Sequence, residues 1–436
     1  MMNLKHMLMS ILFTPVNENK QLLICYASQT GTAMHLAKES GKLASSAGIA
    51  TDVEALERLS PEDLNQYSLT LMIVSTCGEG KIPDNGEAFF KHLERTERLT
   101  AQVQILALGD KSYRQFCLAG KLFHQQLCRI GSCSREDLTL VNGNPIKVWT
   151  QWLESHLEQS LDLGEVPNIN TQTELKLIDK KPLFNTGYAQ VGEAYELLLE
   201  VVKPAVTSYQ VNSLLAITPP GSDRPRLYSV ASSPTESPNH IKLCVSRHRF
   251  CIDGQWSDGH CSNYLTQQLN VDGTLKAEVR VGGGLSLPKA DSPLLLIATG
   301  AGIAPMMSML QERVAQHHTG NNWLIFGNRY SQGDYYYKSK LQHYRDTGVL
   351  EQLDTAFSRD EQKKVYVQNV LEEQSDKLSK WLMQEDLHIY VCGRPELKSA
   401  ILHAIHTVIS NNESHPEKVN ARMTQLSQTQ MTFELF

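Results

Sequence analysis

The chain has 436 residues, of which 41% are hydrophobic and 20% are charged, and its formal net charge at pH 7 is −6. This length predicts two or three domains, each large enough to bury its own core. The composition is that of a folded, soluble protein, and the mild negative charge argues against nucleic-acid binding and against a polybasic membrane anchor.

Nine cysteines are scattered along the chain, and none falls in the CxxC arrangement of zinc or thioredoxin-like sites. We therefore predict no metal site, and reduced thiols favour the cytoplasm. Residues 7–13 are apolar, but they are far fewer than the about 20 residues that span a bilayer. Residues 1–20 are expected to form an N-terminal extension, and no transmembrane segment is expected.

The first strands and helices alternate. Short apolar runs at residues 22–26, 69–75 and 103–108 predict buried parallel strands. Capping and periodic patterns predict helices that begin at residue 33 and at Ser60-Pro61, and helices over residues 87–99 and 121–130. This alternation predicts a doubly wound α/β domain over residues 21–158.

The next segment, residues 159–173, loses this periodicity and is predicted to be a linker. A run of strand-like segments then predicts a small antiparallel β-barrel over residues 174–289, with strands at residues 195–202, 211–217, 226–231, 241–247 and 277–281. Strands and helices alternate again over residues 290–436, which predicts a second α/β domain with strands at residues 294–298, 323–326, 356–358 and 389–392.

Polar loops follow all three strands of the first domain. Ser28, Thr30 and Thr32 offer hydroxyl groups at the end of the first strand, and Gly31 lets the backbone approach a phosphate. No lysine of the triphosphate-binding kind is present, so a monophosphate is favoured. The loops at residues 75–80 (STCGEG) and 108–113 (LGDKSY) add glycines and a tyrosine for a flat ring. Any one such loop is common at a strand end, but three in order indicate a site.

These three loops resemble the FMN-binding loops of flavodoxin-like domains, in the form found in the diflavin reductases, a family that includes the flavoprotein subunit of sulfite reductase. Cys77 departs from the family pattern, because relatives place tyrosine or glutamine there. The resemblance implies FMN binding by Ser28, Gln29, Thr30, Gly31, Thr32, Ala33, Ser75, Thr76, Cys77, Gly78, Gly80, Leu108, Gly109, Asp110, Tyr113, Phe116 and Cys117.

Two motifs in the barrel suit a second flavin. In the stretch RLYS, Arg226 can bind a pyrophosphate, Tyr228 can cover a ring face, and the Ser229 hydroxyl can approach the ring nitrogen that accepts hydride. The stretch GHCS precedes a helix, whose N–H groups can hold phosphate. Both motifs resemble the FAD-binding elements of the ferredoxin-NADP reductase superfamily, in which the second corresponds to Gly259, His260, Cys261 and Ser262.

The last domain carries signals for a dinucleotide. A glycine turn that opens a helix suits a pyrophosphate, although ordinary strand-to-helix turns look similar. The stretch SRDEQKKVY offers several partners to a phosphate, which favours NADPH over NADH, whereas a solvated charged face is the alternative. The family resemblance implies an NADPH site formed by Thr299, Gly300, Gly302, Arg329, Ser358, Arg359, Lys364, Tyr366 and Gln368.

The same resemblance implies a set of residues for hydride transfer. Cys392 matches the family's cysteine beside the nicotinamide, although a buried structural thiol is the alternative. Glu434 stands for the usual aspartate, and Phe436 for the terminal aromatic residue that covers the flavin. Together with Ser229, these three residues are the predicted catalytic set.

The resemblance covers residues 22–436, but only 66 residues lie between Gln159 and Arg226. Diflavin reductases usually insert a helical connecting domain there, so this chain is a compact form. The family implies electron flow from NADPH through FAD and FMN to a one-electron acceptor. The favoured acceptor is a haemoprotein such as that of sulfite reductase. By analogy with the fold, we expect this acceptor to dock on the chain near Asp84 and Glu87.

Two alternatives stay open at this point. The first is a single-flavin NADPH reductase or oxidase that acts on a cytochrome, a ferric complex or a quinone. The second is a non-catalytic docking protein that kept the flavodoxin fold as a scaffold. The sequence leaves the oligomeric state open.

Overall fold

The computed structural model describes residues 22–28, 31–77, 80–109, 111, 115–143, 145–157, 171–188, 191–203, 209–211, 213–222, 225–252, 254–280, 285–413 and 415–436. The chain forms two compact units, Met1–Ile169 and Asn170–Phe436, and each is described by itself. Among the described residues, no helix combines the length and the apolar character needed to cross a membrane. The predicted N-terminal extension and the predicted site residues Gln29, Thr30, Gly78, Asp110 and Tyr113 lie outside the described residues.

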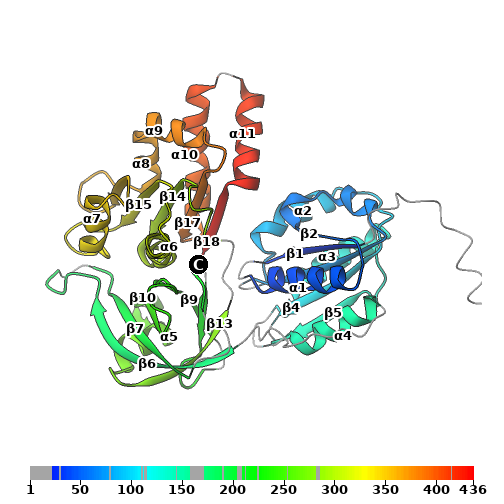
Figure 1. Ribbon diagram of the computed structural model, residues 1–436, viewed down its shortest axis with the longest axis horizontal. Helices are drawn as coiled ribbons and strands as arrows, with labels where there is room; N and C mark the ends of the chain where they lie inside the picture. The colour runs from blue at the N-terminus through cyan, green and yellow to red at the C-terminus, as the bar shows by residue number, and fades with distance from the viewer. Residues whose placement is uncertain are drawn as a thin grey trace, which may run out of the picture. The chain divides into compact units, whose positions relative to one another are not determined.

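The first unit is built on a five-stranded parallel sheet with helices on both faces (Figure 1). Its strands, in the spatial order β2-β1-β3-β4-β5, are β1 (Leu22–Ala27), β2 (Thr51–Ala55), β3 (Leu69–Ser75), β4 (Val103–Gly109) and β5 (Leu138–Asn142). Its helices are α1 (Thr32–Ser46), η1 (Leu56–Arg58), η2 (Pro61–Gln66), α2 (Asp84–Leu93), α3 (Leu118–Arg129) and α4 (Ile146–Leu157). This is the flavodoxin-like order, which places a ligand crevice where the order reverses between β1 and β3.

The apolar runs of the sequence become the central strands because helices cover both faces of the sheet. The helix predicted over residues 87–99 instead occupies Asp84–Leu93. The helix at Ser60-Pro61 is of the 3₁₀ type, and Asp63 Oδ2 accepts the backbone N–H of Ser60 at 2.8 Å. Strands β2 and β5 were not predicted because most of their residues are partly buried or exposed.

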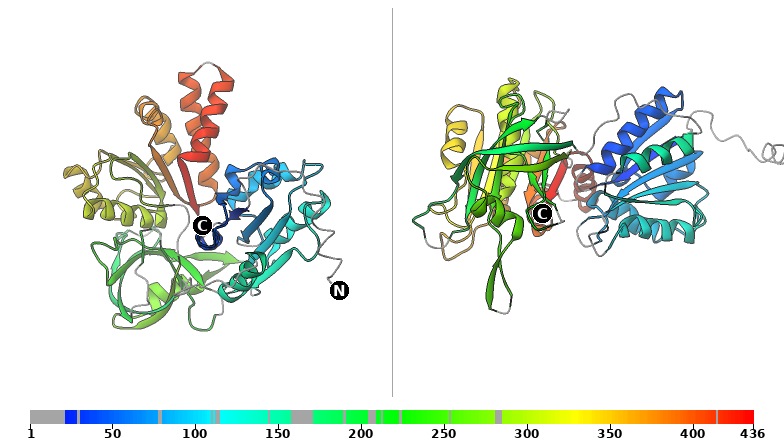
Figure 2. Two further views of the ribbon diagram at one scale, coloured as in Figure 1. Left: turned by 45° about the vertical axis from the view of Figure 1, so that its right-hand side comes forward. Right: turned by 90° about the horizontal axis from the view of Figure 1, so that it is seen from below.

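The second unit begins with an antiparallel barrel. Its strands, in the spatial order β10-β7-β6-β13-β8-β9, are β6 (Thr171–Pro182), β7 (Ala194–Lys203), β8 (Leu214–Ile217), β9 (Arg226–Ser229), β10 (His240–Ser246) and β13 (Thr274–Arg280). A bridge between Val230 and Leu243 joins the two edge strands, which nearly closes the barrel, and Figure 2 shows the strands as a ring. Strand β6 begins within the predicted linker, so residues 171–173 belong to the barrel.

The barrel is extended by a hairpin and a short helical segment. These elements are β11 (Arg249–Ile252), β12 (Gln255–Asp258), α5 (His260–Asn263) and the π-helical turn η3 (Tyr264–Gln268). Buried residues of the barrel strands and of the helical segment form one core cluster.

A second parallel sheet, in the spatial order β16-β15-β14-β17-β18, completes the unit. Its strands are β14 (Leu294–Thr299), β15 (Asn322–Asn328), β16 (Gln352–Phe357), β17 (His388–Gly393) and β18 (Met431–Leu435). Its helices are η4 (Gly300–Gly302), α6 (Ile303–Ala315), α7 (Lys338–Asp346), α8 (Val367–Glu373), α9 (Ser375–Leu382), α10 (Glu396–Asn412) and α11 (Pro416–Thr429). The predicted fold class is therefore confirmed in all three parts.

One core cluster of this sheet also contains the barrel residues Ala194, Val211, Ala231 and Cys244. The barrel and the second sheet therefore share buried side chains. Met431–Leu435 forms an edge strand that pairs in parallel with β17, and the predicted flavin-covering residue Phe436 follows it directly. Backbone pairing thus fixes the position of the last residues.

Candidate active site

In the first unit, two serine hydroxyl groups lie at the ends of the strands that flank the β1/β3 crevice. Ser28 Oγ and Ser75 Oγ are buried and have no hydrogen-bond partner among the described residues. Leaving such a group unpaired costs about 1–3 kcal/mol. A polar ligand in the crevice would remove this cost, so the residues fit the phosphate-bearing ligand that the loops predict.

The start of helix α1 supports the same ligand. Gly31 precedes the helix with φ 85°, and no side chain caps the helix at this residue. An uncapped helix N-terminus directs unpaired N–H groups and the positive end of the helix dipole toward an anion. The Ser28 N–H donates to Asn85 Oδ1 at 2.9 Å, which ties the loop to the first turn of α2. Asn85 was not predicted, because an asparagine in the first turn of a helix is a common local feature.

The loop after β3 closes on itself. The backbones of Cys77 and Lys81 exchange two hydrogen bonds of 2.9 Å. Gly80 has φ 100°, a conformation that favours glycine, so the tight turn requires this residue. Thr76 Oγ1 accepts the Ala119 N–H at 3.3 Å, which connects the loop to the start of α3.

The third loop contains Cys117, whose thiol is directed at carbonyl oxygens of the neighbouring strands. A Cβ atom on Gly109 would lie 2.7 Å from Cys117 Sγ, so only glycine fits there. Cys117 is fully buried, and its thiol lies 3.3 Å from Ala107 O and 3.5 Å from Val141 O. The Cys117 thiol is therefore engaged within the fold, and the place of Cys117 in the FMN site stays a prediction. Ala33 is likewise fully buried in the core, and its place in the FMN site also stays a prediction.

Phe116 lies beside two lysines, Lys111 in the same loop and Lys121 on α3. Lys111 Nζ and Lys121 Nζ lie 5.6 and 5.3 Å from the centroid of its ring, and Lys121 Nζ also donates to Phe116 O at 2.7 Å. The two cation–π contacts stabilise the position of the Phe116 ring. Leu108, at the end of β4, is buried.

On the barrel, the predicted residues of β9 differ in exposure. Arg226 is exposed, and its guanidinium donates to the neighbouring Pro225 O at 3.1 Å. Tyr228 is partly buried, and burial raises the pKa of its phenol, which stays neutral. This arrangement fits an anionic group at Arg226 and a flat ring at Tyr228.

The GHCS motif can offer a ligand mainly its backbone N–H groups. Ser262 Oγ donates to Gly259 O at 3.1 Å and accepts the His248 N–H at 3.0 Å. His260 Nε2 hydrogen-bonds Pro220 O at 2.9 Å, and Cys261 is buried with its thiol 3.6 Å from Ile217 O. The side chains of the motif are thus engaged within the barrel, and the helix that the motif opens has only four residues.

The glycine turn after β14 meets the end of β17. A Cβ atom on Gly302 would lie 2.3 Å from Cys392 O, and one on Gly393 would lie 2.2 Å from Thr299 Oγ1. Both contacts exclude any side chain, so the two strand ends approach closely through glycine. Gly300 has φ 54° and open space around its Cβ position. Helix α6, which follows the turn, has no side-chain cap at its N-terminus. Backbone N–H groups are therefore directed at this turn, as a pyrophosphate requires.

Two arginines meet at the neighbouring ends of β15 and β16. The Arg359 N–H donates to Arg329 O at 2.8 Å, and the Ser358 N–H donates to Asn328 O at 3.0 Å. The Arg359 guanidinium lies 5.9 Å from the centroid of the Tyr330 ring. The Arg359 guanidinium and the Ser358 hydroxyl, which both follow the end of β16, suit a phosphate with two negative charges. Tyr330 was not predicted, although it follows Arg329 directly in the sequence.

The remaining predicted NADPH residues surround the start of α8. Tyr366 precedes the helix and its side chain is 43% exposed, Lys364 is exposed, and Gln368 is partly buried. Asn369 accepts the Tyr366 N–H at 3.0 Å and so fixes the helix start. These side chains lie after β16, on the same strand end as Ser358 and Arg359.

The predicted hydride-transfer residues come together from three strands. Ser229 Oγ, at the end of β9, donates to Glu434 Oε1 at 2.5 Å, and Glu434 stands opposite Cys392 in the β17–β18 register. Burial raises the pKa of Glu434, and the Ser229 hydrogen bond opposes this shift. Burial, followed by the Glu434 charge, raises the pKa of Cys392 well above its ordinary value, so its thiol is neutral.

The terminal residue is held by its backbone. The Phe436 N–H donates to Gly393 O at 3.0 Å, whereas its side chain is 62% exposed. The ring therefore stands at the end of β18, close in sequence to Glu434. Its predicted role as a flavin cover stays a prediction.

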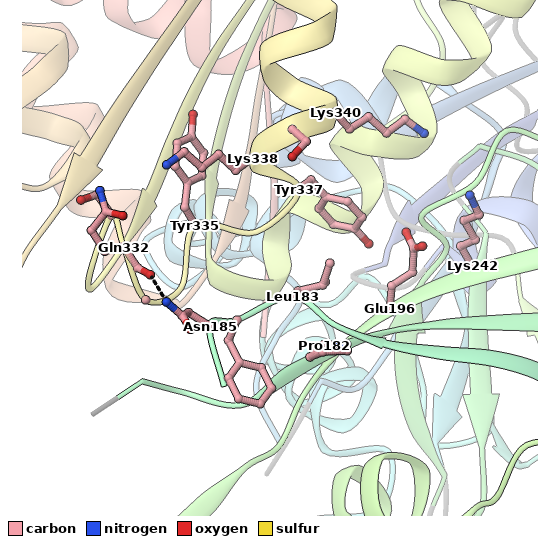
Figure 3. Close-up of a pocket in the computed structure, with 14 residues that line it drawn as sticks. Pro182, Leu183, Asn185, Glu196, Lys242, Gln332, Tyr335, Tyr337, Lys338 and Lys340 are labelled. Atoms are coloured by element: carbon pink, nitrogen blue, oxygen red, sulfur yellow. Dashed lines mark hydrogen bonds between the residues drawn. The ribbon is translucent and has the colours of Figure 1, made fainter. Parts of the chain in front are cut away.

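A cavity of about 470 Å³ also lies in the second unit (Figure 3). Its lining includes Glu196, Lys242, Tyr335, Tyr337 and Lys340, and it contains none of the predicted site residues. The candidate active site is therefore defined by the strand ends and not by this cavity.

Comparisons with known proteins agree with this geometry. Residues 24–145 match the family model described as Flavodoxin, and residues 296–403 match the model described as Oxidoreductase NAD-binding domain.

The similar curated proteins include the sulfite reductase [NADPH] flavoprotein alpha-component of three bacteria. The Bacillus subtilis (strain 168) protein is 27% identical, and the match covers 90% of this chain and 84% of that protein. The proteins of Mannheimia succiniciproducens and Shewanella oneidensis are each 27% identical, with 87% and 89% of this chain and 84% and 85% of those proteins covered. The match to the Bacillus protein extends over 517 residues, which exceeds the 436 residues of this chain, so that protein has insertions that this chain lacks.

Proposed function

Because the chain belongs to the diflavin reductase family, we propose that it passes electrons from NADPH to a one-electron acceptor protein, and that the acceptor is the sulfite reductase haemoprotein. The chain is an NADPH-dependent flavoprotein oxidoreductase, with FMN, FAD and NADPH as cofactors. The observation that carries the proposal is the meeting of Ser229, Cys392 and Glu434 beside the glycine turn at Thr299–Gly302.

When bound, NADPH supplies a hydride, FAD accepts it, and FMN releases the electrons singly, as a haem acceptor requires. The protein's own residues hold the cofactors in place and tune this chemistry. Arg226 and Tyr228 precede the Ser229 hydroxyl on one short strand, and they would hold the phosphate and the ring of the flavin in the second unit.

The Ser229–Glu434 pair supplies a proton position beside the proposed hydride path. The Ser229 hydroxyl proton is directed at Glu434 Oε1. The raised pKa of Glu434 lets its carboxyl group hold a proton at a higher pH than an exposed glutamate does. The neutral thiol of Cys392 adds a small polarizable group without charge.

The preference for NADPH rests on Ser358 and Arg359, which follow the end of β16. Arg329, joined to Arg359 through its backbone, would instead bind the pyrophosphate that both nucleotides carry. NADH lacks the extra phosphate that Ser358 and Arg359 would bind, so it would gain little from them.

The acceptor would dock on the first unit, near the carboxyl ends of its strands. Asp84 and Glu87 lie in the first turn of α2, directly after the loop that follows β3. Acidic residues at this position suit an acceptor with a basic surface. The nine cysteines are free thiols, which supports a cytoplasmic site of action.

An anaerobic difference spectrum tests the acceptor. NADPH is added to purified sulfite reductase haemoprotein with and without this protein, and a b-type cytochrome serves as the comparison acceptor. The proposal expects protein-dependent reduction of the sirohaem bands. Reduction of the cytochrome alone would contradict the sulfite reductase assignment but would leave the reductase assignment intact.

A further inference from the structure

Three metal-ligating side chains meet in the first unit at the end of α3 that lies farthest from the predicted FMN loop. His124 Nε2, Cys128 Sγ and Cys133 Sγ all lie within 4.8 Å of one another. Cys128 Sγ lies 3.4 Å from His124 Nε2 and 3.0 Å from Cys133 Sγ. All three residues are partly buried.

The fold brings these residues together through a helix face and a turn. His124 and Cys128 are four residues apart on α3 and therefore share one face of the helix. The helix ends at Arg129, and Gly131 adopts φ 86°. The Ser132 N–H then donates to Leu127 O at 2.9 Å, which reverses the chain and returns Cys133 to the helix face.

Two thiols and an imidazole are the ligands that Zn²⁺ prefers in proteins. Zn–S bonds of about 2.3 Å at a tetrahedral angle place two sulfur atoms about 3.7 Å apart. The Cys128 and Cys133 sulfur atoms lie 3.0 Å apart, so small side-chain rotations would suffice. His124 Nε2 would exchange its 2.8 Å contact with Ser134 O for the metal.

A carboxylate lies beside the turn that carries Cys133. Asp137 Oδ2 accepts the Ser134 N–H, and a divalent cation bound to the cluster would stabilise the thiolates directly. The nearby Arg129 guanidinium does not balance this charge, since it donates to the carbonyl oxygens of Leu93, at the end of α2, and of Glu94 and Thr96, which follow α2.

We propose that His124, Cys128 and Cys133 form a Zn²⁺ site, with water as the fourth ligand. Binding converts the two thiols to thiolates and releases two protons to solvent, with no change in oxidation state. The metal would fasten the end of α3 to the turn before β5. This inference is independent of the proposed function.

The test uses the full-length protein, with its thiols reduced and freed of metal under anaerobic conditions. Co²⁺ is the probe, because thiolate-bound tetrahedral Co²⁺ absorbs at wavelengths longer than oxidised flavins do. We expect one equivalent to give this spectrum and Zn²⁺ to displace it. Cys128→Ser and His124→Gln should each weaken binding more than about 100-fold, since even outer-shell partners are worth 10–100-fold. Cys251→Ser, which changes an exposed cysteine on β11, is the matched control and should bind normally.

A second measurement needs no variant. Zn²⁺ should protect Cys128 and Cys133 from alkylation, as read by peptide mass spectrometry, while the exposed Cys251 reacts equally with and without metal. Absence of Co²⁺ binding, binding that survives in Cys128→Ser, or equal alkylation with and without Zn²⁺ would each overturn the proposal. A Cys128–Cys133 disulfide that forms in air and persists in the presence of Zn²⁺ would also overturn it.

Discussion

Ser229, on the barrel, donates its hydroxyl hydrogen to Glu434 Oε1, on the last strand of the chain, at 2.5 Å. The two residues are 205 positions apart. Their contact exists because β18 pairs with β17 and because the barrel shares a core with the second sheet. The predicted hydride-transfer residues are therefore positioned by tertiary structure.

Replacing Ser229 tests this pair. Ser229→Ala removes the hydrogen bond to Glu434, and we expect NADPH to reduce the flavin at least about 100-fold more slowly, as is typical for loss of a positioned proton-transfer group. Stopped-flow absorbance under anaerobic conditions measures the rate. Ser257→Ala, on the exposed strand β12, is the control and should leave the rate unchanged. A normal rate in Ser229→Ala would remove Ser229 from the catalytic set.

The raised pKa of Glu434 predicts a pH dependence. As the pH falls, this carboxyl group gains its proton at a higher pH than an exposed glutamate. The carboxylate form of Glu434 accepts the Ser229 hydroxyl proton, so protonation of Glu434 should lower the rate of flavin reduction on the acid side, at a pH above the ordinary value of 4.5. Glu434→Gln should abolish this acid-side decrease in the rate. A pH profile that is the same in the variant would show that another group titrates.

Arg359 predicts a preference for NADPH over NADH. Arg359→Ala should raise the KM for NADPH about 10–100-fold, because a charge-assisted hydrogen bond is worth about 1.5–3 kcal/mol. The KM for NADH should stay the same, since NADH lacks the phosphate. Steady-state kinetics with both nucleotides measure this, with the exposed Arg345→Ala on α7 as the control. An equal effect on both nucleotides would place Arg359 elsewhere in the site.

The turn at Gly302 leaves no room for a side chain. Gly302→Ala would place a Cβ atom 2.3 Å from Cys392 O, so the turn and the end of β17 must separate. We expect a loss of about 1–3 kcal/mol in the free energy of unfolding and weaker NADPH binding. Denaturant unfolding and nucleotide titration measure the two effects. Gly187→Ala, whose Cβ would meet only Asn185 Oδ1 at 3.4 Å, should be neutral. A fully stable Gly302→Ala protein would contradict the close approach.

The acidic turn of α2 predicts where the acceptor docks. Glu87→Lys should slow electron transfer to the acceptor, most strongly at low salt, while leaving reduction of the protein's own flavins by NADPH unchanged. Glu136→Lys, which precedes β5 at the amino ends of the strands, is the control. Equal acceptor reduction in Glu87→Lys and the native protein would count against docking at this turn.

The sequence predicted those parts of the fold in which local pattern and tertiary burial agree. Strand β3 matches its apolar run because both faces of the sheet are covered. Strand β18 was missed because Met431–Leu435 becomes a strand only through its pairing with β17. The sequence also did not reveal the direction of one side chain: Cys117 stands in a predicted FMN-binding loop, yet its thiol is buried against strand carbonyls. The His124, Cys128 and Cys133 cluster was missed because the turn at Gly131, and not a CxxC spacing, brings the thiols together.

The central claim is that one chain carries two flavins that NADPH reduces in sequence. An anaerobic titration of the purified protein with NADPH tests it most directly, together with the flavin content measured after denaturation. The account predicts equal amounts of FMN and FAD, and bleaching that is complete only after two equivalents of NADPH per chain. FAD alone, with bleaching complete at one equivalent, would contradict the account and would favour a single-flavin reductase.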